Sequence, residues 1–221
     1  MAEALRLFFV AFYAIGVVVL VLRVLPLAFR SAPAEQRAEG TNLYLPFILL
    51  PVGFLVPPAA MLTGAGELDV GWPAVRLVGL LLGLYAAVIL PWSASTLGRF
   101  LVPQARVSSD HELVVEGPFR FVRHPAYSGD LALWLGSALA TLNILLLVLW
   151  PLYLLGASIQ SRVEDGLLES KFGQEYRRYA TRVGRFVPLS RIVRGGHLNG
   201  RDPGPSSGTT NESGPPQSRS G

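Results

Sequence analysis

The feature of this 221-residue sequence that most constrains its fold is Leu131–Ile159, a run of 29 residues without one charged side chain. As a single helix rising 1.5 Å per residue it would be about 43 Å long, which exceeds the roughly 30 Å apolar core of a bilayer. A break near Thr141-Leu142-Asn143 would divide it into two short helices. The run therefore predicts two consecutive membrane-spanning helices that form a hairpin.

Three earlier stretches are also about as long as a membrane-spanning helix requires, namely Leu7–Leu27, Leu43–Leu62 and Ala74–Trp92. The first has no signal-peptide cleavage pattern after it, so we predict a retained anchor. The second contains four prolines, which predict a kinked or broken helix. The third contains Gly79-x-x-x-Gly83, a spacing that allows close helix packing. Together with the hairpin, these stretches predict an all-α, polytopic membrane protein with about five spans.

Composition and charge support this class and suggest an orientation. Hydrophobic residues make up 51% of the chain and charged residues 15%, whereas a soluble domain carries roughly 25% charged residues. The mean hydropathy is +0.42, which makes an ordinary soluble enzyme a poor interpretation. With five spans, 17 of the 19 Lys and Arg residues fall on one side. The positive-inside rule therefore predicts an outer amino terminus and a cytosolic carboxyl terminus, and the net charge of +4 implies no nucleic-acid partner.

The remaining composition excludes several chemistries and defines the regions. The absence of cysteine excludes disulfides, thiolate metal sites and a cysteine nucleophile, and three scattered histidines predict no metal site. In residues 195–221, Gly, Pro and Ser account for 16 of 27 positions, so we expect a disordered cytoplasmic tail. We predict three amino-terminal spans in 1–95 and the functional region in 96–194. Gly64-Ala65-Gly66 is interpreted as a turn in an outer loop.

Two inner-side segments differ from ordinary loops. In the first, Arg99–Gly129, the pair Gly117-Pro118 predicts a turn. His124 precedes a proline, so it should be extended, with Pro125 in the first turn of the following helix. In the second, Ser161–Pro188, one stripe of an amphipathic helix interrupted by Gly173 is predicted by the spacing of Glu164, Leu168, Phe172, Tyr176, Tyr179 and Val183.

These segments carry two long motifs in order. The first is Gly117-Pro118-Phe119-Arg120-x-x-Arg123-His124-Pro125-x-Tyr127-x-Gly129. The second is Arg162-x-Glu164-Asp165-x-x-Leu168-x-x-x-Phe172-Gly173-x-x-Tyr176-x-x-Tyr179-x-x-x-Val183-x-Arg185-Phe186-x-Pro188. Together they resemble the signature of the isoprenylcysteine carboxyl methyltransferase and phospholipid methyltransferase superfamily of integral membrane methyltransferases. The resemblance covers roughly residues 113–188, and the first 95 residues match only as apolar spans.

The resemblance implies a methyltransferase that uses S-adenosylmethionine at the cytosolic membrane face and has no Rossmann domain. By this resemblance the cofactor would lie against Leu113, Val114, Gly117, His124, Pro125, Tyr127, Gly129, Glu164 and Asp165. Members of the family commonly have two glutamates where this chain has Glu164-Asp165, so Asp165 is the less certain member. Arginine can clamp a carboxylate of cofactor or substrate, and the candidates are Arg123, Arg162 and Arg185, which the sequence does not rank.

Other functions stay open at this point. Tyr127-Ser128-Gly129-Asp130 also resembles sterol-type membrane reductases that use NADPH. A transporter or scaffold is a third possibility, although the apolar runs carry no ionisable residue near their middles. The lipophilic methyl acceptor is not identified by the sequence: a carboxylate acceptor would need no base, whereas for an amine or thiol Glu164 or His124 is the candidate base. If the source is bacterial, the location would be the inner membrane. The oligomeric state is not predicted.

Overall fold

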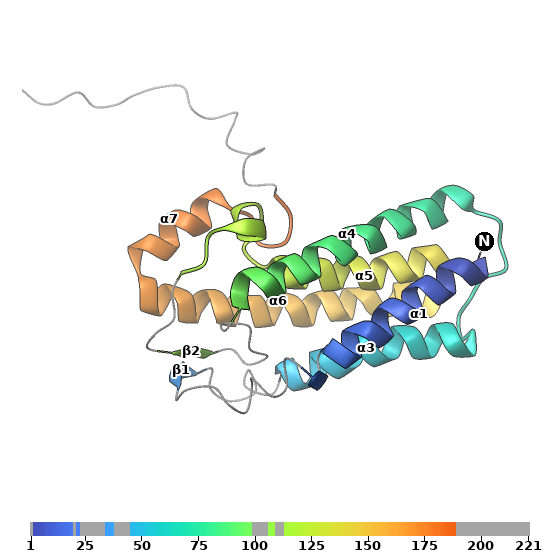
Figure 1. Cartoon of the computed structure of the whole chain (residues 1–221), viewed down its shortest axis with the longest axis horizontal. Coiled ribbons are helices and arrows are strands. Elements are labelled where there is room, and N and C mark those ends of the chain that lie inside the picture. The colour runs from blue at the N-terminus through green and yellow to red at the C-terminus, as the bar shows by residue number, and fades with distance from the viewer. Residues whose placement is uncertain are drawn as a thin grey trace, which may run out of the picture.

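In a computed structural model the chain forms an elongated helical bundle, and the structure describes residues 2–19, 21–22, 34–37, 45–98, 106–108 and 113–188. The described α-helices are α1 (Ala2–Val19), α3 (Leu45–Thr63), α4 (Pro73–Leu97), α5 (Pro125–Thr141), α6 (Ile144–Phe172) and α7 (Gln174–Arg182). A short 3₁₀ helix, η4 (Gly117–Arg120), comes before α5. Figure 1 shows that α4, α5 and α6 run side by side, with α1 and α3 against them. The predicted cytoplasmic tail, 195–221, lies outside the described residues.

The predicted break in the long apolar run is confirmed. α5 ends at Thr141 and α6 begins at Ile144. Leu142 adopts the left-handed conformation, with φ of 54°. The side chain of Asn143 then accepts a hydrogen bond from the Leu146 amide at 3.0 Å, which caps the new helix. A left-handed residue followed by an amide cap turns the chain back on itself within two residues, so α5 and α6 form the expected hairpin.

The interface of α4 and α5 depends on glycines. A Cβ on Gly79 would lie 2.3 Å from the Ala140 amide nitrogen, and one on Gly136 would lie 2.9 Å from the Gly79 carbonyl oxygen. No side chain fits between the two backbones at this crossing. The predicted close-packing role of Gly79 is therefore confirmed. Arg76, also on α4, is buried and donates a hydrogen bond to the Ala140 carbonyl oxygen at 2.7 Å. This carbonyl lies in the last turn of α5 and thereby gains a hydrogen-bond partner.

Several predicted boundaries need correction. α1 begins at Ala2, five residues before the predicted span, and Arg23 and the residues to Leu27 lie outside the described part. α3 contains Pro51, Pro57 and Pro58 and is not broken, so of the predicted kinked or broken helix the break is not found. No separate helix begins at Ser161, because α6 continues to Phe172. The residues from Ser161 to Phe172 contain no proline, so the charged segment simply extends the apolar helix.

The fold also contains one element that the sequence does not predict. The short strands β1 (Ala34–Arg37) and β2 (Arg106–Ser108) pair antiparallel, with Ala34 opposite Ser108 and Arg37 opposite Arg106. Strands of three and four residues are too short to show a periodic pattern. Apart from this ladder, the described elements are helical, as predicted.

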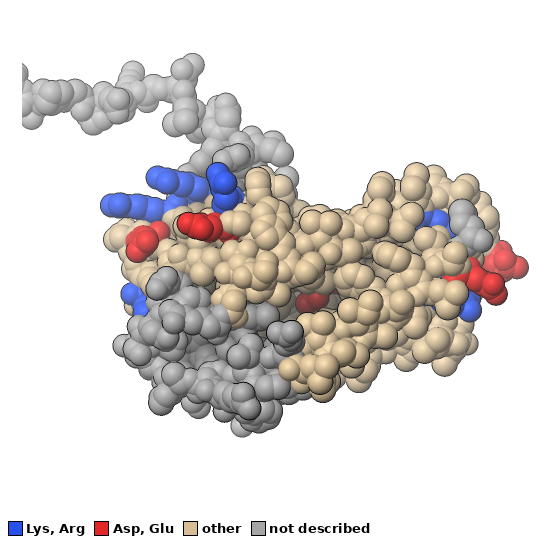
Figure 2. Space-filling view, viewed as in Figure 1, with Lys and Arg blue, Asp and Glu red and all other residues tan. Residues whose placement is uncertain are grey.

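The surface of the bundle is that of a membrane protein. Three of the described helices, α1, α4 and α6, are long and apolar enough to cross a bilayer. Large apolar side chains on them lie exposed, for example Leu7, Val88 and Leu152, each more than 60% exposed. Figure 2 shows an almost uncharged middle, with Lys and Arg gathered at the end that carries α7. An apolar waist of this kind is stable in lipid rather than in water.

Candidate functional site

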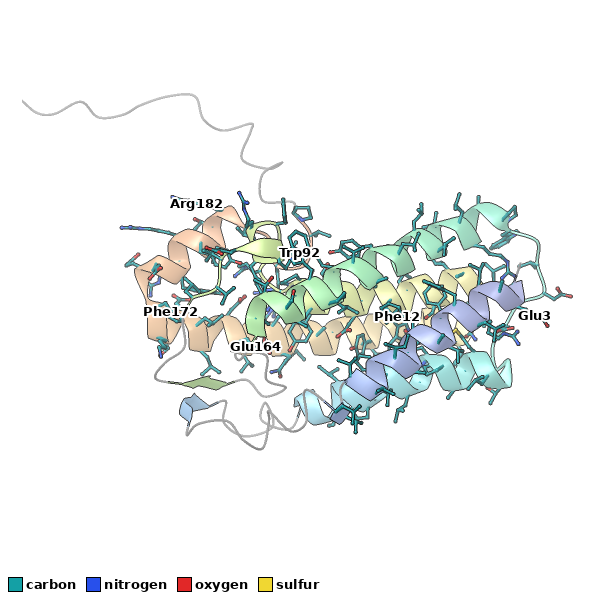
Figure 3. The ribbon with its side chains drawn as sticks, in the orientation of Figure 1. Glu3, Phe12, Trp92, Glu164, Phe172 and Arg182 are labelled. Carbon is teal, nitrogen blue, oxygen red and sulfur yellow. The ribbon has the colours of Figure 1, made fainter. Side chains whose placement is uncertain are left out.

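The candidate site lies at the end of the bundle that carries α7, where the two motifs of the sequence meet. Glu164 lies toward this end and Glu3 at the opposite one (Figure 3). α7 ends at Arg182, after which the chain returns to the loop before α5. The amides of Arg123 and His124 donate to the carbonyl oxygens of Gly184 and Arg185, at 2.8 and 3.0 Å. The second motif thus holds the first through its backbone.

The loop before α5 has the predicted turn at Gly117 but differs from the prediction at His124. Gly117 has a φ of +56°, and a Cβ there would lie 2.7 Å from the Thr96 hydroxyl, so the turn favours glycine for both reasons. His124 is the residue before α5, with φ of −123° and ψ of 67°, so it is not in the extended conformation that was predicted, whereas Pro125 occupies the first turn as expected. The hydroxyl of Tyr179 donates to the Phe119 carbonyl at 2.8 Å and fixes the loop from α7.

Asp165 is the most connected side chain of the site. Its carboxylate lies 2.7 Å from His124 Nε2 and 3.1 Å from a terminal nitrogen of Arg123. Arg185 donates to it through two nitrogens, at 3.2 and 2.9 Å, and the hydroxyl of Tyr176 donates as well. Through these bonds Asp165 joins α6, α7 and both motifs, whereas its expected place as the less certain contact of cofactor or substrate stays a prediction.

Glu164 forms a second and separate set of contacts. Tyr127 donates its hydroxyl to Glu164 Oε1 at 2.6 Å, and Gln160 Nε2 donates to the same oxygen at 3.2 Å. His124 Nδ1 lies 3.5 Å from the other carboxylate oxygen. The Glu164 side chain is 27% exposed, so one part of it faces away from these partners. The two neighbouring acids thus have different sets of partners. Asp165 binds both arginines, His124 and Tyr176, whereas Glu164 binds Tyr127 and Gln160 and lies near His124.

The imidazole of His124 lies between the two acids, which affects its charge. Burial opposes the charged form and so lowers the pKa of His124. The hydrogen bonds and the negative charges of Asp165 and Glu164 outweigh this effect and raise the pKa above its usual value of 6.5. The site therefore favours a protonated imidazole that donates to both carboxylates.

The helix turn at Gly173 explains why the predicted stripe does not form. Gly173 has a φ of +53°, so α7 starts in a new direction, and Val183 is extended rather than helical. Tyr176 consequently reaches Asp165 and not Glu164. The expectation that Glu164, Tyr176 and Tyr179 share one helical face is wrong, because a helical repeat is not maintained across a left-handed residue.

The other predicted residues divide into two groups. Arg123 and Arg185 lie in the site, whereas Arg162 is exposed and takes no part in the bonds of Glu164 and Asp165. Gly129 is buried against α4, where a Cβ would lie 2.7 Å from atoms of Ile89 and Leu90, so packing already accounts for it. The remaining predicted cofactor contacts, Leu113 and Val114, are half-buried before the turn at Gly117.

Sequence reasoning missed Gln160. This side chain is fully buried on α6, one turn before Glu164, and its Oε1 has no hydrogen-bond partner. The signal was present, since Gln160 is a polar residue four positions before Glu164 and directly after the apolar run. A second buried atom, Arg123 Nε, also has no partner. Buried polar atoms of this kind are uncommon in folded proteins and mark positions where a ligand can bind.

The residues present fit S-adenosylmethionine by their chemistry. The Glu164 carboxylate can accept from amino or ribose hydroxyl groups, and Arg123 Nε can donate to a carboxylate. The rings of His124, Tyr127 and Phe186 pack against one another with centroids 5.8 to 6.5 Å apart, and Tyr127 and His124 both contact Glu164. Aromatic faces suit both a flat purine and a cationic sulfur. The site thus combines acceptors, a donor and aromatic walls.

Together, the bundle and this site define a helical membrane protein with a cluster of polar side chains at one end of its apolar helices. Residues 75–175 match the family described as phospholipid methyltransferase. A probable protein-S-isoprenylcysteine O-methyltransferase of Oryza sativa subsp. indica is 32% identical over 122 residues, which are 52% of this chain and 62% of that protein. The chain is thus similar to isoprenylcysteine and phospholipid methyltransferases over about half of its length.

Two further relatives extend this comparison. Protein-S-isoprenylcysteine O-methyltransferase of Saccharomyces cerevisiae is 32% identical over 114 residues, which are 49% of this chain and 46% of that protein. An uncharacterized protein of Haemophilus influenzae is 42% identical over 55 residues, which are 25% of this chain and 79% of that protein. The chain therefore spans between about half and two thirds of the two named relatives.

Proposed function

We propose that this protein is an S-adenosylmethionine-dependent methyltransferase of the membrane that transfers a methyl group to a lipophilic acceptor. The observation that carries the proposal is the convergence of Tyr127, His124 and Gln160 on Glu164 at the polar end of the bundle. The family, and relatives named as O-methyltransferases, support the same activity. These features favour it over a reductase, transporter or scaffold.

The residues have distinct roles in this proposal. When bound, S-adenosylmethionine supplies a methyl group on a positively charged sulfur. Glu164 and Tyr127 bind and orient the cofactor, and Arg123 Nε donates to its carboxylate. Asp165 acts through others: it holds His124, Arg123 and Arg185 in place. The remaining work of such a site is alignment and exclusion of water, which the buried side chains provide.

We further propose a topology of five spans, α1, α3, α4, α5 and α6, with the site on the cytosolic side. α1, α4 and α6 end toward the site, and α3 and α5 end toward the opposite end of the bundle (Figure 1). Cytosolic loops of membrane proteins are rich in Lys and Arg. A lipophilic acceptor would then enter from the bilayer and the cofactor from the cytosol.

Binding of S-adenosylmethionine to the detergent-purified full chain tests the proposal. We expect calorimetric binding to the wild type and a loss of affinity of about tenfold in Glu164→Gln and in Tyr127→Phe, since each loses a hydrogen bond to a charged group. Glu175→Gln, at an exposed position on α7, is the matched control and should bind as the wild type does. Binding of NADPH instead, or equal affinity in all variants, would contradict the proposal.

A further inference from the structure

Residues 184–186, which follow α7, are held against the start of α5 through three successive carbonyl oxygens. The first two accept hydrogen bonds from the backbone amides of Arg123 and His124, at 2.8 and 3.0 Å. The third, of Phe186, accepts from the side-chain hydroxyl of Ser128 at 2.7 Å. Every residue except proline supplies a backbone amide, so only the third bond depends on a particular side chain.

Ser128 is itself held by α4, because its hydroxyl oxygen lies 2.9 Å from the hydroxyl oxygen of Tyr85. A serine hydroxyl has one proton, and the Phe186 carbonyl can only accept, so this proton is used in the bond to Phe186. Tyr85 is therefore the donor to Ser128. Two hydrogen bonds in series thus connect α4, through α5, to the segment after α7. Ser128 is buried, so water does not readily replace a lost partner.

Phe186 connects this pair of bonds to the candidate site. The centroid of its ring lies 6.3 Å from that of His124 and 6.5 Å from that of Tyr127. Both of these residues contact Glu164. Among the described residues, no hydrogen bond joins the Ser128 hydroxyl to Glu164 itself. Any effect of Ser128 on the site must therefore pass through Phe186, whose carbonyl it binds.

We propose that Ser128 is a positioning residue of the methyltransferase site, which acts through Phe186 and is held in place by Tyr85. This inference rests on the proposed function. Without the Ser128 hydroxyl, the segment after α7 keeps its two backbone bonds but loses the one at Phe186, so the aromatic ring is free to move away from His124. The first motif leaves position 128 unspecified, and α4 lies outside both motifs, so neither motif indicates this role.

Ser128→Ala removes the hydroxyl and tests the proposal. We expect the affinity of the detergent-purified full chain for S-adenosylmethionine, measured by calorimetry, to fall about fivefold, as for one lost hydrogen bond. Ser128→Thr keeps the hydroxyl and should stay within about twofold of the wild type. In Tyr85→Phe the bond to Phe186 is kept, so the loss should be smaller than in Ser128→Ala. Wild-type affinity in Ser128→Ala, or a threonine variant as weak as the alanine variant, would overturn the proposal.

Ser137→Ala is the matched control, since Ser137 is also a buried serine on α5. Its hydroxyl donates to the Trp134 carbonyl at 2.8 Å and lies 3.4 Å from the hydroxyl of Tyr13 on α1. This variant should lower the melting temperature about as much as Ser128→Ala does, with S-adenosylmethionine affinity within about twofold of the wild type. An equal loss of affinity in both serine variants would show a general effect on the fold and would overturn the proposal.

A double-mutant cycle with Phe186→Leu tests whether Ser128 acts through the ring. Phe186→Leu keeps the carbonyl and an apolar side chain but removes the ring, and we expect it to weaken S-adenosylmethionine binding about tenfold. Adding Ser128→Ala to this variant should change the affinity by less than about twofold, because the ring that Ser128 positions is already absent. Losses that multiply independently would overturn the proposal. Failure of the wild type to bind S-adenosylmethionine would instead refute the proposed function.

Discussion

At the scale of single residues, the two neighbouring acids of α6 divide the work of the site. Asp165 contacts Arg123, His124, Arg185 and Tyr176, and its side chain is 12% exposed. Neutralising it would leave cationic groups buried without their counter-charge, which is more costly than loss of an exposed ion pair. Loss of the Asp165 charge is therefore expected to lower mainly the stability of the fold. It should change cofactor affinity only indirectly, by shifting the side chains that Asp165 holds in place.

Asp165→Asn is accordingly expected to lower the free energy of unfolding by about 3 kcal/mol. Glu169→Gln removes a comparable ion pair, to Arg177, whose side chains are 45% and 58% exposed, and should cost less than about 1 kcal/mol. Denaturation of the two variants in the same detergent makes the comparison. Equal losses would show that Asp165 is not the centre of a buried network.

The charge of His124 predicts a pH dependence. Its pKa is raised above 6.5 in the folded protein, so the stabilisation from its bonds to Asp165 and Glu164 is complete below pH 6.5. This stabilisation is lost as the pH rises through the higher pKa of the folded state. As the pH rises through this range, we expect the melting temperature of the wild type to fall more than the melting temperature of His124→Gln, whose side chain does not titrate. Parallel curves for the two proteins would contradict a protonated His124.

At the scale of elements, α6 links the apolar and polar halves of the protein. It runs without a break from the hairpin turn to Phe172, so Tyr153, Gln160 and Glu164 lie on one rigid face. The position of α5 against this face depends in turn on its glycine contact with α4. The position of the α5 residues of the site relative to α6 therefore depends on how closely the backbones of α4 and α5 approach each other.

Two glycine substitutions should have opposite effects for this reason. Gly79→Ala places a methyl group 2.3 Å from the Ala140 backbone and should cost about 1 to 3 kcal/mol. Gly166→Ala, on α6 with open space around it, should stabilise by about 0.5 to 1 kcal/mol, because alanine favours helix. Thermal unfolding of both variants checks the signs. A neutral Gly79→Ala would mean that the two helices are not in close contact.

At the scale of the whole molecule, polar groups gather at the two ends of an apolar bundle. One end contains both motifs and most of the basic side chains, whereas the other contains Arg6, which is paired with Glu67, and the hairpin turn. The proposed orientation follows from this separation, since a bilayer leaves only the two ends in water.

Because the chain has no cysteine, single introduced cysteines can test the orientation. We expect Asp69→Cys to react with a membrane-impermeant maleimide in intact cells. Gln174→Cys, at the start of α7, should react only after the membrane is opened. The reverse pattern would place the site on the outer side, and reaction of both in intact cells would contradict a topology that spans the membrane.

Some of this molecule follows from the sequence alone. The length of the apolar runs, the hairpin break at Leu142, the turn at Gly117 and the family signature are local properties, and each depends on neighbouring residues or on simple counts. Bilayer thickness and backbone conformation act on them directly. The membrane class and the two segments that build the site could therefore be predicted.

The tertiary structure alone decided which side chains meet. The positive φ of Gly173 redirected α7, so Tyr176 joined Asp165 and the predicted stripe was lost. Arg162 was left exposed, and Gln160 became fully buried one turn before Glu164. These outcomes depend on the direction of one helix relative to another, which no local pattern contains, because packing across the bundle determines it.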